Sequence, residues 1–165
     1  MAVDTPQTPA RYSRVQIALH WGIAALFAFN YIVSDGMGRA LRNFSQTGIN
    51  DSLTAQLHII GGIFLLGLMV LRLVFRALHG APPHASSGYP LMDKAAIWGH
   101  RALYVLLLLL PMAGLAAWFG GLKVAGEAHE VLVNLTALLI VGHIAAALYH
   151  QFILKDRLLD RMRPQ

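Results

Sequence analysis

The chain contains no cysteine among its 165 residues. This absence excludes disulfides, thiolate metal sites, iron–sulfur clusters and covalently attached c-type haem. Charged residues are also few, at 13% of the chain, whereas a soluble domain carries about 25%. Hydrophobic residues make up 56%, and the mean hydropathy is +0.55. This combination is typical of a membrane protein.

The apolar residues are concentrated in four long blocks. They predict helices at about 14–34, 53–76, 94–119 and 128–153. Each block is long enough to cross a hydrocarbon layer about 30 Å thick, which takes about 20 helical residues. None has the alternating pattern of membrane β-strands. We therefore expect an all-α membrane protein in which residues 1–165 form one four-helix transmembrane bundle, with residues 1–10 as a loose N-terminal tail.

Basic residues flank the predicted helices unequally. Of the thirteen, Arg39, Arg42 and Lys123 lie on one side of the bundle, and the other ten lie on the side of the chain termini. Because cytoplasmic loops of membrane proteins are enriched in Lys and Arg, this distribution predicts that both termini are cytoplasmic. Cations beside apolar helices are the ordinary orienting signal, so we expect a lipid bilayer and no nucleic acid as partner.

The chain has eight histidines, which is many for so apolar a sequence. His79 and His84 lie in the predicted cytoplasmic loop, where they are expected to contact water. The other six lie in the predicted helices: His20, His58, His100, His129, His143 and His150. Ionisable residues inside a membrane are costly and usually functional. Six of them exceed what the packing of a small bundle requires.

Depth in the bundle groups these histidines. His58, five residues into its predicted helix at 53–76, and His129, at the start of its own, lie near the non-cytoplasmic side. His143 follows His129 by fourteen residues, or about 21 Å along a helix, which returns it to the level of His20. Fourteen residues are close to four turns, so His129 and His143 face the same side. His100 lies about as deep as His20 and His143, so depth alone does not exclude it as a ligand.

Two facing histidines at one depth are what a six-coordinate haem requires. Such a haem has both axial positions filled, so it transfers single electrons and does not bind oxygen. Two of them near opposite faces would form an electron path across the membrane. Gly61 and Gly114 are expected to leave room for the rings. Candidates to pair with haem propionates are Arg14, Arg72 and Arg76 on the cytoplasmic side, and Arg39, Arg42 or Lys123 on the other.

The sequence leaves two roles open for His150 and two for His100, and it can be weighed against two other classes of function. His150, one heptad beyond His143, either donates a hydrogen bond or a proton to a quinone or simply contacts water at the interface. His100 either ligates iron or lies beside a ligand or the cofactor edge. A metal permease would need carboxylates along its path, which the predicted helices lack outside their ends. A purely structural bundle would make the matched depths a coincidence.

Four stretches resemble the bacterial cytochrome b561 family: RYSRVQIALHW at 11–21, LHIIGGIFLLGLMVLRLVFR at 57–76, GHRALYVLLLLLPMAGL at 99–115, and AHEVLVNLTALLIVGHIAAALYHQFILKDRLLDRM at 128–162. The resemblance implies a bacterial inner-membrane protein with two b haems. The implied axial ligands are His20 with His143 on the cytoplasmic side, and His58 with His129 on the periplasmic side.

The same resemblance implies an oxidoreductase that oxidises periplasmic superoxide and reduces ubiquinone. Arg39, Arg42 and Lys123 would then attract the superoxide anion, because clustered cations raise the local concentration of a small anion. The alternative is a b-type electron-transfer subunit that links another periplasmic redox enzyme, such as a hydrogenase or a dehydrogenase, to the quinone pool.

Overall fold

The computed structural model describes residues 11–83 and 88–163, so the expected loose tail at 1–10 and His84 lie outside the described residues. Four described helices are long and apolar enough to cross a membrane, and no strand occurs in the described ranges. The expected all-α membrane fold is therefore confirmed. The elements are α1 (Arg14–Ile32), α2 (Met37–Thr47), α3 (Leu53–His79), α4 (Pro90–Gly120), α5 (Lys123–Tyr149), a π-helical turn (His150–Leu154) and a 3-10 helix (Leu158–Met162).

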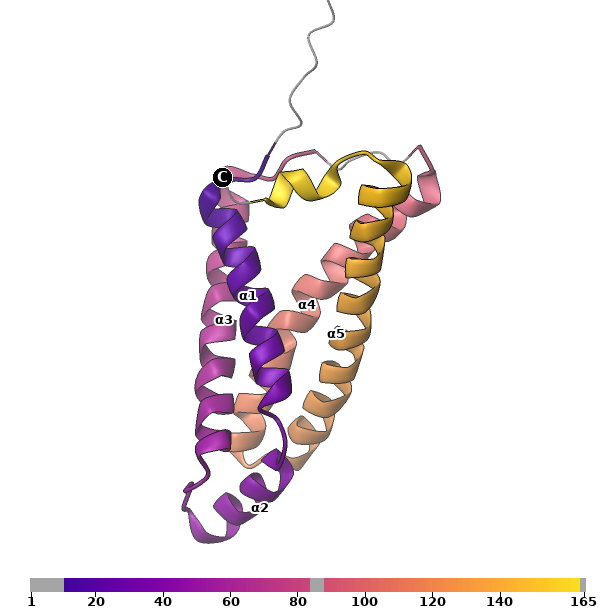
Figure 1. Ribbon diagram of the computed structural model, residues 1–165. Helices are drawn as coiled ribbons and strands as arrows, with labels where there is room; N and C mark the ends of the chain where they lie inside the picture. The colour runs from indigo at the N-terminus through magenta and orange to yellow at the C-terminus, as the bar shows by residue number, and fades with distance from the viewer. Residues whose placement is uncertain (1–10, 84–87, 164–165) are drawn as a thin grey trace, which may run out of the picture.

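The four long helices run along the length of the molecule, and the short α2 lies across one end (Figure 1). Within the bundle, α1 packs against α3, α3 against α4, and α4 against α5. The 3-10 helix near the end of the chain and the start of α1 lie together at the opposite end (Figure 1). We call this the terminal end, and the other the α2 end.

The packed core lies midway along the bundle. Ile23 of α1, Leu65 and Met69 of α3, and Leu110 of α4 form a cluster of buried side chains. Outside it, many large apolar side chains are exposed, such as Ile32 at 77% and Leu138 at 70%. So much exposed apolar surface is unfavourable in water and suits helices that are surrounded by lipid.

The start of α1 has a capping box built from Ser13 and Gln16. The Ser13 hydroxyl accepts a hydrogen bond from the Gln16 backbone N–H, and the Gln16 side-chain oxygen accepts one from the Ser13 N–H. These bonds satisfy backbone donors that have no partner within the helix. Gln16 Nε2 also donates to the Gly80 carbonyl at 2.8 Å. The Ser-x-x-Gln part of the first motif thus begins α1 and joins it to the end of α3.

Two helices begin earlier than hydrophobicity alone indicates. α5 begins at Lys123, so that His129 lies inside the helix and not at its start. The turn before it uses Gly121 with φ +63°, a left-handed conformation that glycine adopts without strain. α4 begins at Pro90, because proline is favourable at the first helical position, where its missing N–H is not needed.

Candidate functional site

Four of the predicted site histidines form two close pairs. His20 of α1 and His143 of α5 have ring centroids 6.4 Å apart, with an interplanar angle of 67°. His58 of α3 and His129 of α5 have centroids 6.2 Å apart at 80°. The two pairs lie at different levels of the bundle, because α5 contributes to both with residues about 21 Å apart along its axis. Each pair joins helices that are distant in the sequence.

The ring separations can be tested against two imidazoles on one metal. A bond from a metal to an imidazole nitrogen is about 2.0–2.1 Å long. In a five-membered ring with bonds of about 1.33 Å, each nitrogen lies about 1.1 Å from the ring centre. Two axial imidazoles on one metal therefore have centroids about 6.3 Å apart. The observed 6.4 and 6.2 Å both fit this separation.

Each pair offers two imidazole rings as possible ligands. In residues 11–83 and 88–163, no three His, Asp or Glu side chains cluster so that they could hold a metal ion by themselves. A haem brings four equatorial nitrogens of its own and needs only the two axial ligands. The donor set therefore fits haem iron better than a bare ion.

Backbone carbonyls of neighbouring helices orient the His58 and His129 rings. His58 Nδ1 lies 3.1 Å from the Asn30 carbonyl of α1, and His129 Nδ1 lies 2.8 Å from the Leu110 carbonyl of α4. A carbonyl only accepts, so each Nδ1 carries the proton and each Nε2 keeps its lone pair for a metal. The Asn30 carbonyl is free for this contact because it is among the last four of α1, which lack helical partners.

One glycine lies close to this histidine pair, and another lies close to Asn30. A Cβ added at Gly114 would lie 3.0 Å from His129 Nδ1 and Cε1. Because glycine has no Cβ, the His129 ring can approach the Leu110 carbonyl. Gly61 instead lies against the Asn30 side-chain amide, where a Cβ would overlap it. Asn30 is 7% exposed, and its Oδ1 has no hydrogen-bond partner. Sequence reasoning missed Asn30, although a lone amide after the apolar run 22–29 was a usable signal.

His100 and Trp21 lie beside the other pair. The His100 ring centroid is 5.1 Å from that of His143, at 82°. This is shorter than the separation that two ligands of one metal need, so His100 is an edge-to-face neighbour of His143. Its Nδ1 lies 2.6 Å from the Ala96 carbonyl. The Trp21 ring lies 5.4 Å from that of His20.

Arg72 and Arg76 gather around one tyrosine that sequence reasoning missed. Arg72 donates to the Tyr104 hydroxyl at 3.2 Å and to the Gln16 carbonyl at 2.8 Å. The Arg76 guanidinium lies 5.6 Å from the Tyr104 ring centroid, within cation–π range. Both arginines thus lie at the terminal end with their side chains held in place. Arg14, the first residue of α1, is exposed.

The predicted cations of the opposite side lie at the α2 end. Arg39 and Arg42 are exposed on α2, and Lys123 is the exposed first residue of α5. The Phe44 ring of α2 stacks on Trp118 of α4, with centroids 4.9 Å apart. This contact attaches α2 to the last turns of α4.

His150 is buried, although one of the two sequence-based interpretations had it in contact with water. Its exposed fraction is 8%, and its Nδ1 lies 2.5 Å from Asp156 Oδ2. Sequence reasoning did not identify Asp156 as its partner. The pair lies just beyond α5, near the terminal end.

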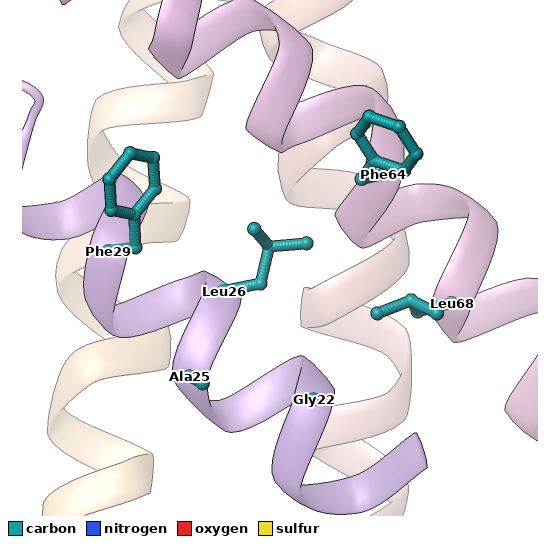
Figure 2. Close-up of a pocket in the computed structure, with 6 residues that line it drawn as sticks. All are labelled: Gly22, Ala25, Leu26, Phe29, Phe64 and Leu68. Carbon is teal, nitrogen blue, oxygen red and sulfur yellow. The ribbon is translucent and has the colours of Figure 1, made fainter. Parts of the chain in front are cut away.

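An apolar groove of about 430 Å³ lies between α1 and α3, and Figure 2 shows the side chains that line it. Phe29 projects from α1 on one side and Phe64 from α3 on the other (Figure 2). Gly22, Ala25, Leu26 and Leu68 complete the lining. None of these residues carries a polar side chain, so the groove contains no group that could form a side-chain hydrogen bond with a redox substrate.

Comparisons with known proteins identify the family of the chain. A family model described as prokaryotic cytochrome b561 matches residues 11–165. Cytochrome b562 of Cereibacter sphaeroides is 40% identical over 155 residues, covering 93% of this chain and 96% of its own. Cytochrome b561 homolog 1 of Escherichia coli is 30% identical, covering 94% and 98%. A protein of Yersinia pestis called probable superoxide oxidase CybB is 28% identical, covering 94% and 97%.

Family membership implies a b-type haem and electron transfer. Four apolar helices and the family together make the chain a membrane protein. The chain therefore belongs to the prokaryotic cytochrome b561 family, whose members are membrane electron carriers.

Proposed function

We propose that the chain is a diheme superoxide:ubiquinone oxidoreductase. His20 and His143 would hold one haem b at the terminal end, and His58 and His129 would hold a second at the α2 end. The observation that carries the proposal is the pair of ring separations, 6.4 and 6.2 Å, at two levels of one bundle. A haem held by two histidines would supply one-electron transfer and would leave the iron no free position for oxygen.

The remaining site residues have roles at the two ends. At the terminal end, Arg72, Arg76 and the exposed Arg14 pair with propionates, since guanidinium groups bind carboxylates with strong hydrogen bonds. At the α2 end, the propionate partners come from the cations Arg39, Arg42 and Lys123. His100 lies against His143 and supports its ring.

The same three cations attract superoxide, because they raise the local concentration of a small anion. A relative called probable superoxide oxidase supports this choice of donor, at 28% identity. Two superoxide anions, one ubiquinone and two protons give two oxygen molecules and one ubiquinol. His150, near the terminal end, would donate a hydrogen bond or a proton to the quinone. The excess of basic residues at the terminal end predicts that this end is cytoplasmic and that the membrane is the bacterial inner membrane.

Histidine substitution tests the ligand assignment. We expect a dithionite-reduced spectrum and a pyridine haemochrome assay to report two b haems per purified chain. His143→Ala and His129→Ala should each remove one haem and leave the other, because each residue belongs to a different pair. The control is His79→Ala, which changes an exposed histidine outside both pairs. Retention of both haems in either ligand variant contradicts the assignment.

The purified wild-type chain tests the substrate assignment. It should convert a short-chain ubiquinone to quinol when a superoxide-generating system is its electron source. Quinol formation that needs an added periplasmic redox protein contradicts this assignment and favours the electron-transfer subunit.

A further inference from the structure

The backbone is unusual directly after α5. Residues His150–Leu154 form a π-helical turn, a feature that is frequent at functional sites. Lys155 and Arg157 follow with φ of +55° and +57°, and they are the only non-glycine residues with positive φ within the described ranges. Such conformations are unfavourable for residues with a Cβ and persist where other contacts impose them. Both residues flank Asp156.

The contacts of Asp156 explain what imposes this backbone. Its Oδ2 lies 2.5 Å from His150 Nδ1, and its Oδ1 accepts a hydrogen bond from the Leu158 N–H at 3.1 Å. Its own N–H donates to the His150 carbonyl at 3.3 Å. Both carboxylate oxygens of Asp156 and its backbone N–H therefore have hydrogen-bond partners. The strained turn brings the carboxylate back onto the ring of the residue that follows α5.

The pair extends from the protein interior toward water. The His150 side chain is 11% exposed, and the Asp156 side chain is 26% exposed. In the same turn, the Gln151 Oε1 atom is buried without a hydrogen-bond partner. A carboxylate at Nδ1 selects the tautomer with its proton on Nδ1 and stabilises the imidazolium ion. Nε2 then becomes the nitrogen that can exchange a proton with another group.

We propose that Asp156 is the positioning residue of a proton-donating pair, in which His150 Nε2–H protonates a carbonyl oxygen of the reduced quinone. The inference rests on the proposed function for the identity of the acceptor. The N–H bond at Nε2 breaks as the O–H bond of the quinol forms, and the imidazolium becomes neutral imidazole with its proton on Nδ1. Water at the terminal end returns a proton to Nε2. The quinone's two electrons come from two superoxide anions.

Asp156→Asn tests the proton-donating role in the haem-loaded full chain. The amide oxygen can still accept from Leu158, but the amide NH₂ donates to His150 Nδ1, so the imidazolium is no longer stabilised. The protein is reduced with dithionite, freed of excess reductant and mixed with decylubiquinone, so that superoxide is not needed. We expect haem reoxidation to slow about 100-fold, the lower end of general acid catalysis. Asp156→Glu should recover most of the rate.

Asp160→Asn is the matched control. Asp160 lies in the same segment, and its carboxylate pairs with Arg157 Nε at 2.7 Å. We expect its haem reoxidation rate to stay within about twofold of wild type. The haem spectra of all variants should match wild type, since none of these residues belongs to the histidine pairs.

A tautomer measurement tests the positioning role without any turnover. In the ¹⁵N NMR spectrum of reduced, histidine-labelled protein, His150→Gln identifies the His150 signals. We expect a protonated Nδ1 in wild type and in Asp160→Asn, and the neutral tautomer with its proton on Nε2 in Asp156→Asn. An unchanged tautomer in Asp156→Asn overturns the positioning role.

The outcomes separate the inference from the proposed function. A changed tautomer with a wild-type rate of haem reoxidation overturns proton donation by the pair. A wild-type protein whose reduced haems do not react with decylubiquinone overturns the proposed quinone reduction and this inference together. A wild-type protein that reacts with decylubiquinone but not with superoxide overturns only the proposed donor.

Discussion

At the residue scale, single atoms of neighbouring helices orient the histidine rings. The Leu110 carbonyl contacts His129 Nδ1 at 2.8 Å, and the ring can approach because Gly114 has no side chain. Hydrogen bonds of this type hold a ligand ring in one orientation and raise its basicity. Gly114 is therefore important for the geometry of the His58–His129 pair, because it leaves space for the His129 ring.

Gly114→Ala should disturb that pair alone. The new Cβ would lie 3.0 Å from the ring, so the ring must shift and its bond to Leu110 weakens. Loss of such a partner reduces metal affinity by about 10- to 100-fold. We expect the haem proposed for this pair to be lost on dilution or to change its midpoint potential in a redox titration. The other haem should behave as in wild type.

Gly67→Ala is the control for this prediction. Gly67 lies in α3, and a Cβ added there would meet nothing within 4 Å, so alanine at this position adds only helix propensity. Equal effects of the two substitutions would contradict a local role for Gly114.

At the element scale, α2 depends on a few contacts for its position. It has eleven residues and is bounded by Gly36 and Gly48, whose φ angles are +80° and +71°. Isolated helices of this length are marginally stable in water. The stack of Phe44 on Trp118 therefore contributes to holding α2, with its cations Arg39 and Arg42, across the end of the bundle.

Phe44→Ala should loosen α2 and leave the long helices unchanged. An aromatic pair contributes about 0.5–1.5 kcal/mol beyond its buried area. Hydrogen exchange of the amides in residues 39–47 should therefore become about 2- to 12-fold faster. Asn43→Ala is the matched control, because Asn43 is exposed on the same helix. Accelerated exchange in α5 as well would show that the stack supports the whole bundle.

At the scale of the whole molecule, the segment from Lys155 to Met162 connects several elements at the terminal end. It crosses from α5 toward α1 (Figure 1). Trp21 Nε1 donates to the Met162 carbonyl at 3.0 Å, and Arg161 donates to the Pro83 carbonyl at 2.7 Å. These bonds connect the segment to α1 and to the connection after α3. The segment that follows the Asp156 turn is therefore attached both to α1 and to the connection after α3.

Trp21→Phe should release this segment while keeping an aromatic ring next to His20. The lost hydrogen bond is worth about 0.5–1.5 kcal/mol. Trypsin cleavage after Arg157 or Arg161 should therefore become about 2- to 12-fold faster. Trp98→Phe is the control, since Trp98 is 65% exposed on α4. A cleavage rate that does not differ from the control would show that Trp21 does not hold the segment.

The sequence by itself determined the membrane class, the four long helices and the grouping of histidines by depth. These features depend on local composition and on the fixed rise and turn of an α-helix, so they can be calculated along one segment. The expected pairing of His20 with His143, and of His58 with His129, corresponds to ring pairs that the structure brings together.

Only the tertiary structure decided which groups surround those rings. The Asn30 and Leu110 carbonyls, Tyr104 between two arginines, and Asp156 on His150 became visible as partners only in three dimensions. The first three are contacts between different helices, and the fourth depends on two left-handed residues after α5. Such contacts follow from how helices pack and how a connection turns, and neither is encoded in the period of a single helix.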